Sequence, residues 1–94
     1  MSDLQVTRIG LSTGVTLAAQ LGGREGAEPI ILLHGFPESH RTWRRIAPQL
    51  ARDYFVVAPD QRGFAGSDKP EGVEAYRTDR IDADLVALAD ALGL

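Results

Sequence analysis

The residues with the clearest chemical potential lie where a short apolar run gives way to a stiff turn. Residues 29–38 read Pro-Ile-Ile-Leu-Leu-His-Gly-Phe-Pro-Glu, and the consecutive aliphatic residues after the first proline predict a strand buried on both faces. Gly35 permits a backbone conformation closed to other residues, and Pro37 fixes its own φ. Because open α/β sheets bind ligands at the carboxyl ends of their strands, we expect residues 34–37 to form half of a ligand site.

A second loop of this kind follows another apolar run. The stretch from Tyr54 to Ala58 predicts a second buried strand, and residues 59–70 after it read Pro-Asp-Gln-Arg-Gly-Phe-Ala-Gly-Ser-Asp-Lys-Pro. Asp60 and Arg62 place opposite charges at the start of this loop, which suits charge-assisted hydrogen bonds to a neighbouring loop. Together with the helical pattern that separates them, the two runs predict a βαβ unit.

The two loops together resemble the α/β-hydrolase superfamily, and most closely its epoxide hydrolase and dehalogenase branch. Residues 34–37 match the oxyanion-loop motif His-Gly-x-Pro, and residues 60–70 resemble the motif Asp-x-Arg-Gly-x-Gly-x-Ser-x-x-Pro. The second match departs at Ala65, where the family has a glycine. Either Ala65 takes a strained positive φ, or the bend shifts to Gly66. The resemblance covers nearly the whole chain.

The resemblance implies a role for each residue of the two motifs. The backbone N–H of Phe36 would be the catalytic group, as one of two oxyanion-hole donors, and one such donor is worth about 3 kcal/mol. The Phe36–Pro37 peptide bond is expected to be cis. The residues expected to support the loop are His34, Gly35, Pro37, Asp60, Arg62 and Gly63. His34 would do so through side-chain hydrogen bonds and not as a general base, because the family's base lies farther along the chain.

The first part of the chain predicts an antiparallel hairpin. The stretches from Gln5 to Leu11 and from Val15 to Leu21 read as strands about a Ser-Thr-Gly turn, and the strict alternation of the second predicts that it is half-buried. A βαβ unit and a further helix follow, so the fold class is α/β, as the incomplete N-terminal part of an α/β-hydrolase sheet. Residues 1–94 would form one such fragment, with strands one to four and helices A and B but no nucleophile elbow.

The helix of the βαβ unit is expected over residues 40–52. Its inward face would carry Trp43, Ile46 and Leu50 at helical spacing, with Trp43 in the core, and Pro48 would interrupt the helix near Ala47. The polar residues expected in solvent are Glu38, His40, Arg41, Arg44 and Arg45.

A last helix is expected to begin with Thr78 or Asp79 as its N-cap and to end at Gly93. Its apolar stripe consists of Ile81, Leu85, Leu88 and Leu92, and the acidic residues expected on other faces are Asp82, Asp84 and Asp90. An α/β protein needs another parallel strand after such a helix, so we expect Leu85, Leu88 and Leu92 to lose much of their packing surface.

Composition excludes several classes of function. The formal net charge is −3, so nothing favours nucleic acid or an anionic membrane as a partner. The absence of cysteine excludes disulfides and thiolate metal sites, and we expect neither a metal nor a cofactor. The first residues lack the pattern of a signal peptide, and no apolar run approaches the length of a membrane span. A cytoplasmic protein is therefore expected.

The resemblance implies a hydrolase that acts on a small-molecule substrate through a covalent ester intermediate, as epoxide hydrolases do. A serine esterase and a fluoroacetate-type dehalogenase are alternatives, because this chain carries no nucleophile elbow. The third alternative is a truncated, non-catalytic fragment, and we expect the 94-residue chain alone to be inactive. The apolar run at residues 30–33 would form an unpaired sheet edge. We therefore expect the lone chain to be marginally stable, so that it self-associates through this edge or folds properly only with the remaining C-terminal part.

Overall fold

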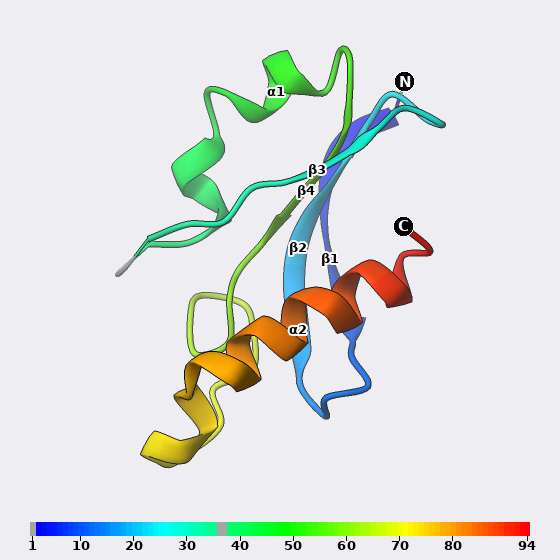
Figure 1. Ribbon diagram of the computed structural model, residues 1–94. Helices are drawn as coiled ribbons and strands as arrows, with labels where there is room; N and C mark the ends of the chain where they lie inside the picture. Colours follow the sequence, from blue (N-terminus) through cyan, green and yellow to red (C-terminus); the bar gives the residue numbers. More distant parts are fainter. Residues whose placement is uncertain (1, 36–37) are drawn as a thin grey trace.

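The protein folds as a four-stranded mixed sheet with helices on both faces (Figure 1). The computed structural model describes residues 2–35 and 38–94. The strands are β1 (Ser2–Gly10), β2 (Thr16–Gly23), β3 (Pro29–Ile31) and β4 (Phe55–Pro59), and the helices are η1 (His40–Trp43), α1 (Ala47–Leu50), η2 (Val73–Tyr76) and α2 (Thr78–Ala91). The strand order is β1-β2-β4-β3, with β4 antiparallel to β2 and parallel to β3. This confirms the predicted α/β class.

β1 and β2 form the predicted antiparallel hairpin. Its turn is closed by a hydrogen bond from the Leu11 N–H to the Val15 carbonyl at 2.9 Å. The prediction that β2 is half-buried is wrong at its centre, where Leu17, Ala18 and Ala19 are all buried. The reason is that β2 lies between β1 and β4, with side chains of α2 against one face and the loop after β4 against the other.

β3 lies at an edge of the sheet. In the part of the chain that the structure describes, it has β4 on one side and no strand on the other, which agrees with the predicted unpaired edge. The strand ends at Ile31, although the Leu32 N–H still donates to the Val57 carbonyl at 2.9 Å. Leu33 is 41% exposed. The prediction of a strand buried on both faces is therefore wrong. Leu32 is buried, but Ile30 and Ile31 are only half-buried, because in the described part of the chain the sheet and its cover end at this strand.

Residues 40–52 form two short pieces instead of one helix. η1 is a 3₁₀ helix, and α1 begins at Ala47 after an intervening turn. Pro48 lies in the first turn of α1, where a helix does not need its N–H, so the interruption falls where it was predicted. Trp43 is confirmed as a core residue. Together with Leu50 it packs against the buried cluster of Leu32, Ala47, Ala51, Val56 and Ala58. Ile46 is 48% exposed, because it precedes α1 as its N-cap.

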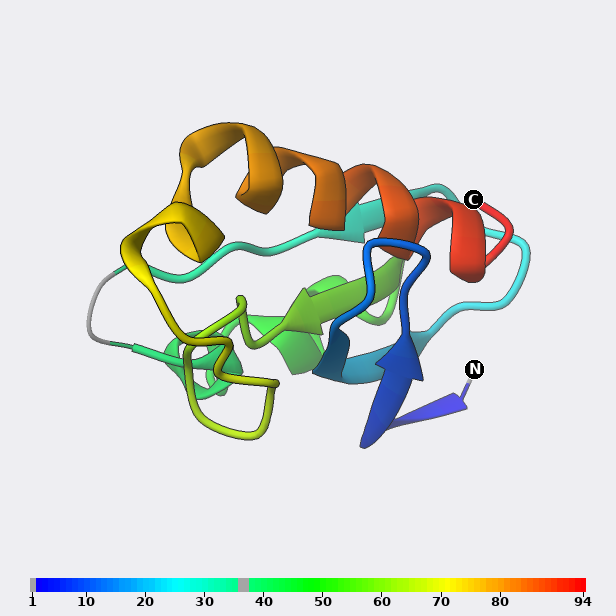
Figure 2. The same ribbon diagram turned by 90° about the horizontal axis from the view of Figure 1, so that it is seen from below.

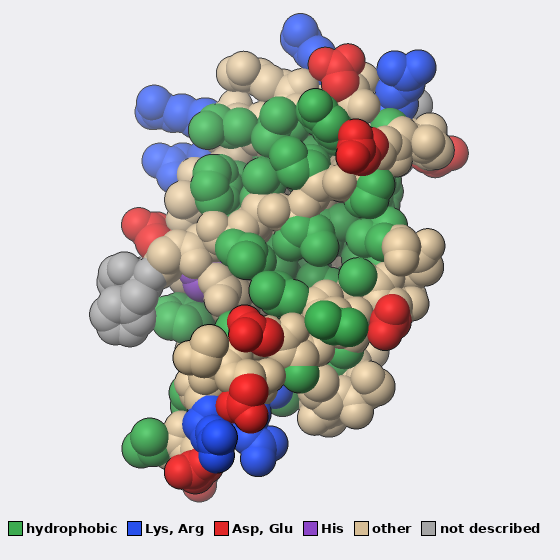
Figure 3. Space-filling view, viewed as in Figure 1, with side chains coloured by type: hydrophobic (Ala, Val, Ile, Leu, Met, Phe, Trp, Pro, Cys, Tyr) green, Lys and Arg blue, Asp and Glu red, His purple; other side chains and the backbone are tan. Residues whose placement is uncertain are grey.

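α2 covers the opposite face of the sheet from α1 (Figure 2). Its apolar stripe is confirmed, and Leu88 is completely buried in a cluster with Leu11, Val15, Leu17, Val57 and Ala87. The expected loss of packing is thus wrong for Leu88, since the sheet alone buries it. Hydrophobic side chains remain visible around α2 on the face shown in Figure 3. Among the described residues, no helix is both long and apolar enough to cross a membrane.

The two ends of α2 differ in how they are capped. The predicted N-cap is wrong, because Arg77 holds that position without a side-chain cap hydrogen bond and Thr78 is already helical. The predicted end at Gly93 is confirmed, with φ at +71°. The Gly93 N–H donates to the Asp90 carbonyl at 3.1 Å and the Leu94 N–H to the Ala89 carbonyl at 2.9 Å, which is the bonding pattern of a Schellman end.

Candidate functional site

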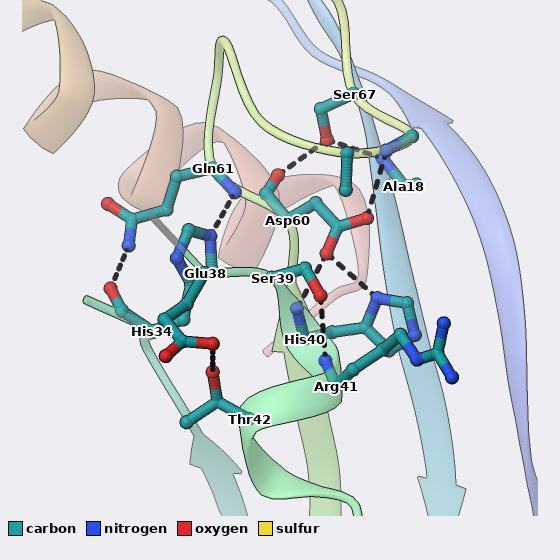
Figure 4. A network of polar contacts seen from close by, with 12 residues as sticks. Ala18, His34, Glu38, Ser39, His40, Arg41, Thr42, Asp60, Gln61 and Ser67 are labelled. Carbon is teal, nitrogen blue, oxygen red and sulfur yellow. Dashed lines mark hydrogen bonds and ion pairs between the residues drawn. The ribbon is translucent and has the colours of Figure 1, made fainter. Parts of the chain in front are cut away.

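The loops after β3 and β4 are joined by Gln61 (Figure 4). Its backbone N–H donates to Nε2 of His34 at 3.0 Å, and its side-chain amide donates to the His34 carbonyl at 2.7 Å. β3 and β4 are parallel neighbours, so the residues that follow their carboxyl ends lie side by side. No sequence pattern pointed to Gln61, because the motif leaves that position variable.

The hydrogen bonds of His34 define its tautomer. A backbone N–H can only donate, so Nε2 of His34 must accept from Gln61 and the ring proton must sit on Nδ1. Nδ1 then donates to the Gly35 carbonyl at 2.9 Å. The ring is buried, and the ring of Phe64 meets it edge-on at a centroid distance of 5.1 Å. Neither nitrogen is left to take a substrate proton, so His34 can hold the loop but cannot act as its base.

Asp60 holds the other end of the same segment. Its Oδ1 accepts from the His40 backbone N–H at 2.6 Å and from Nδ1 of the His40 ring at 2.8 Å, while Oδ2 accepts from the Gly66 N–H at 3.2 Å. The carboxylate is completely enclosed, and the His40 side chain is 18% exposed. The prediction that His40 lies in solvent is therefore wrong, because the buried carboxylate needs donors and this ring supplies one.

Arg62 points away from the segment 34–40 toward α2. Its Nε and Nη2 donate to the two oxygens of Asp84 at 2.6 and 2.7 Å, and its Nη1 donates to the Ala75 carbonyl at 2.7 Å. The hydrogen bonds to the Asp84 carboxylate raise the pKa of Arg62 above its ordinary value. The placement of Asp84 on another face of α2 is wrong, since it is buried beside the apolar stripe. A signal existed, because Asp84 stands three residues after Ile81 and four before Leu88.

The start of the loop after β4 is shaped by close packing. Gly63 has φ at +88°, and a Cβ there would lie 2.6 Å from Cε1 of Tyr76, so no other residue fits without a shift. Ser67 is buried, and its hydroxyl donates to the Asp60 carbonyl and accepts from the Ala18 N–H. These contacts hold the backbone of Asp60, and with it the carboxylate, against β2.

The backbone of Ala65 decides between the two alternatives for the second motif, a strained positive φ at this residue or a bend shifted to Gly66. It has φ at +45° and is the one non-glycine residue with a positive φ in the described part of the chain. The strained alternative is therefore the one that occurs. Gly66 is needed for a different reason, because a Cβ there would lie 3.0 Å from Cβ of Ala18.

Comparison with known proteins places this arrangement in a family. A model of the alpha/beta hydrolase fold matches residues 28–94. The chain belongs to the α/β-hydrolase family. This confirms the predicted resemblance, including its branch, since the similar proteins are named epoxide hydrolases and dehalogenases.

Three similar proteins illustrate how much of a hydrolase the chain represents. It is 49% identical over 83 residues to epoxide hydrolase A of Mycobacterium tuberculosis, covering 87% of this chain and 26% of the relative. It is 48% identical over 58 residues to a fluoroacetate dehalogenase of a Burkholderia species, covering 62% of this chain and 18% of the relative. The solved epoxide hydrolase A of Mycobacterium thermoresistibile superposes with a TM-score of 0.91 at 40% identity, covering 97% of this chain and 28% of that chain.

The hydrolase motif residues Phe36 and Pro37 lie outside the described residues, and so does the predicted cis bond, which stays a prediction. Their neighbours are described. The Glu38 N–H donates to the Gly35 carbonyl at 2.9 Å, and the exposed Glu38 carboxylate accepts from the Thr42 hydroxyl at 3.2 Å. Glu38 thus helps to fix the start of η1.

His40 and Asp60 also have the geometry of a catalytic His–Asp pair, in which a carboxylate orients the imidazole through Nδ1. A hydrolase would need a nucleophile or a water at the other nitrogen. Among the described residues, no hydrogen bond to Nε2 of His40 is present, and the nearby Ser67 hydroxyl is already engaged. No group of three or more His, Cys, Asp or Glu side chains in the described part of the chain could hold a metal ion.

Proposed function

We propose that this chain forms the oxyanion-loop part of an epoxide hydrolase-like enzyme that cleaves a small-molecule substrate through a covalent ester intermediate. The observation that supports this most is the attachment of the segment 34–40 at both ends, by Gln61 to His34 and by Asp60 to His40. A catalytic donor in such a segment needs no reorganisation when charge develops, which is the condition for electrostatic catalysis. The names of the relatives support the substrate class.

The donor in this proposal is the backbone N–H of Phe36. Hydrolysis of an ester intermediate builds negative charge on an oxygen, and one preorganised N–H that meets this charge contributes about 3 kcal/mol. His34, Gly35, Pro37, Asp60, Arg62 and Gly63 support the loop in this proposal. His34 and Asp60 do so through the hydrogen bonds described above. Gly63 and Arg62 act indirectly in this proposal, because they hold the loop after β4 against Tyr76 and Asp84.

The fluoroacetate dehalogenase relative supports a second candidate reaction, carbon–halogen cleavage through the same kind of ester. A serine esterase is a third candidate. The residues that distinguish these reactions belong to a nucleophile elbow, which the 94 residues do not contain. For the same reason we expect the chain by itself to show no turnover of an epoxide, a haloacid or an aryl ester.

A chimera tests the proposal. Residues 1–94 would replace the matching segment of epoxide hydrolase A of M. tuberculosis, and turnover of an epoxide would be measured. We expect activity, reduced about 10²–10³-fold by Phe36→Pro, which removes the N–H, and little changed by Phe36→Leu, which keeps it. Circular dichroism and sedimentation would confirm that each variant folds. A folded wild-type chimera without activity, or equal loss in the two variants, would contradict the proposal.

We also propose that residues 1–94 form an N-terminal fragment of a single hydrolase domain. In this proposal the lone fragment self-associates through the β3 edge. Support comes from the unshared edge of β3 and from the exposure of Leu33 beside it. Unpaired strand edges with apolar side chains recruit other strands.

A further inference from the structure

Two adjacent residues attach the segment 34–40 to the end of β4. Asp60 binds its last residue, His40, through two hydrogen bonds to one carboxylate oxygen, and Gln61 binds its first residue, His34, through two hydrogen bonds of its own. We call Asp60 and Gln61 the anchor pair. Figure 4 shows them side by side, with the two histidines reaching them from opposite ends of the segment. The anchor pair therefore sets the separation between the two ends of the loop.

The two attachments differ in strength. The Gln61 bonds join neutral groups, whereas both His40 bonds end on a carboxylate that is 1% exposed. Hydrogen bonds to a buried charge are about twice as strong as those between neutral groups. Of the two donors of His40, the backbone N–H is present in any residue but proline. The ring N–H is the contribution that the choice of histidine makes.

We propose that His40 is a positioning residue of the hydrolase: its ring Nδ1–H, bound to Asp60, fixes the exit of the segment 34–40 so that the oxyanion donor stays in place. The inference rests on the proposed function, and it assigns His40 no contact with the substrate. The rival role is that of a general base oriented by Asp60, which needs Nε2 of the ring. The substitution His40→Asn separates the two roles, because Asn places an N–H donor near the position of Nδ1 and cannot act as a base.

The first test uses amide hydrogen exchange in the 94-residue chain and needs no activity. The reporter is the Glu38 N–H, which bonds to the Gly35 carbonyl inside the segment. We expect His40→Ala to speed its exchange about tenfold, the value of one charge-assisted hydrogen bond, and His40→Asn to keep it close to the wild type. Arg41→Ala is the matched control, since this neighbouring side chain is exposed. Equal exchange in the wild type and His40→Ala would overturn the proposal.

The second test uses the kinetics of the chimera with epoxide hydrolase A. We expect His40→Ala to lower kcat about tenfold with KM unchanged, because a displaced donor weakens transition-state binding alone. His40→Asn should restore most of kcat, and Gln61→Met, which removes the side-chain amide at the other end, should cause a smaller loss. If His40→Asn is as inactive as His40→Ala, the ring is a base and the proposal is wrong. An inactive wild-type chimera would contradict the proposed function and would not test the role of His40. The exchange measurement would still decide that role.

Discussion

Arg62 and Asp84 form a bidentate ion pair inside the domain, with the Nε–Oδ2 distance at 2.6 Å and the Nη2–Oδ1 distance at 2.7 Å. The Thr13 hydroxyl donates to the same carboxylate at 2.8 Å. One acidic side chain of α2 therefore meets both the loop after β4 and the turn of the hairpin. Three segments that are remote in sequence depend on it for their relative positions.

Breaking this pair should destabilise the domain strongly. Arg62→Leu leaves the Asp84 carboxylate buried without its partner, and the expected loss of unfolding free energy is about 3–5 kcal/mol. The double variant Arg62→Leu/Asp84→Leu should recover much of the lost free energy, because this site then holds no unpaired charge. Arg77→Ala is the control, since its ion pairs are exposed and worth at most about 1 kcal/mol. Urea denaturation of the chimera would measure all four proteins, and equal losses for Arg62→Leu and Arg77→Ala would refute the expectation.

Ala65→Gly should stabilise the protein. The positive φ of +45° strains alanine but not glycine, and the expected gain is about 0.5–1 kcal/mol after the greater unfolded-state freedom of glycine is subtracted. Gly66→Ala, one position later, should instead destabilise, because its Cβ would press on Ala18. Denaturant midpoints would show the two shifts, and a lower midpoint for Ala65→Gly would mean that the strain is absent in solution.

Asp68 should make stability depend on acid pH. The hydrogen bond from the Thr16 backbone, followed by that from the Arg8 side chain, lowers the pKa of Asp68 below its ordinary 3.8. A lowered folded pKa stabilises the fold above the unfolded value, and this contribution is lost as the pH falls through the folded value. Asp68→Asn should therefore melt earlier than the wild type at neutral pH and approach it in acid below 3.8. A difference in melting temperature between the wild type and Asp68→Asn that stays constant with pH would contradict the assignment.

The β3 edge should control self-association of the lone chain. We expect the 94-residue wild type to form larger species at micromolar concentrations. Leu33→Lys should reduce them, because a charge close to the end of an edge strand opposes pairing with another strand. Val73→Lys is the control, since this side chain is 90% exposed but lies on η2. Sedimentation velocity would compare the three. A monodisperse wild type with a cooperative denaturant transition would show that the fragment closes its own core.

The sequence predicted the parts of the fold that local patterns encode. The hairpin, β4, the interruption near Ala47 and the end of α2 at Gly93 each depend on residues close together in the chain, and all are confirmed. The family likewise followed from two short motifs. These features need no knowledge of which distant segments meet.

The errors concern residues whose surroundings are supplied from far away. Its place at the start of a predicted helix puts His40 in solvent, yet its ring binds the buried carboxylate of Asp60, twenty positions later. The spacing of the apolar residues predicts Asp84 on another face of α2, yet Arg62 gives it a buried partner. Buried polar pairs of this kind obey satisfaction rules that only the folded geometry can apply.

The position of the anchor pair after β4 has a consequence for the order of folding. His34 is hydrogen-bonded to Gln61, 27 positions later, and His40 to Asp60, 20 positions later. Both attachments therefore close long loops. A chain emerging from the ribosome cannot complete the segment 34–40 when that segment is made. Residue 61 must first leave the ribosome, and β4 must then pair with β3. Substitutions that slow this strand pairing should therefore delay the appearance of a competent oxyanion loop, even when they leave the final structure unchanged.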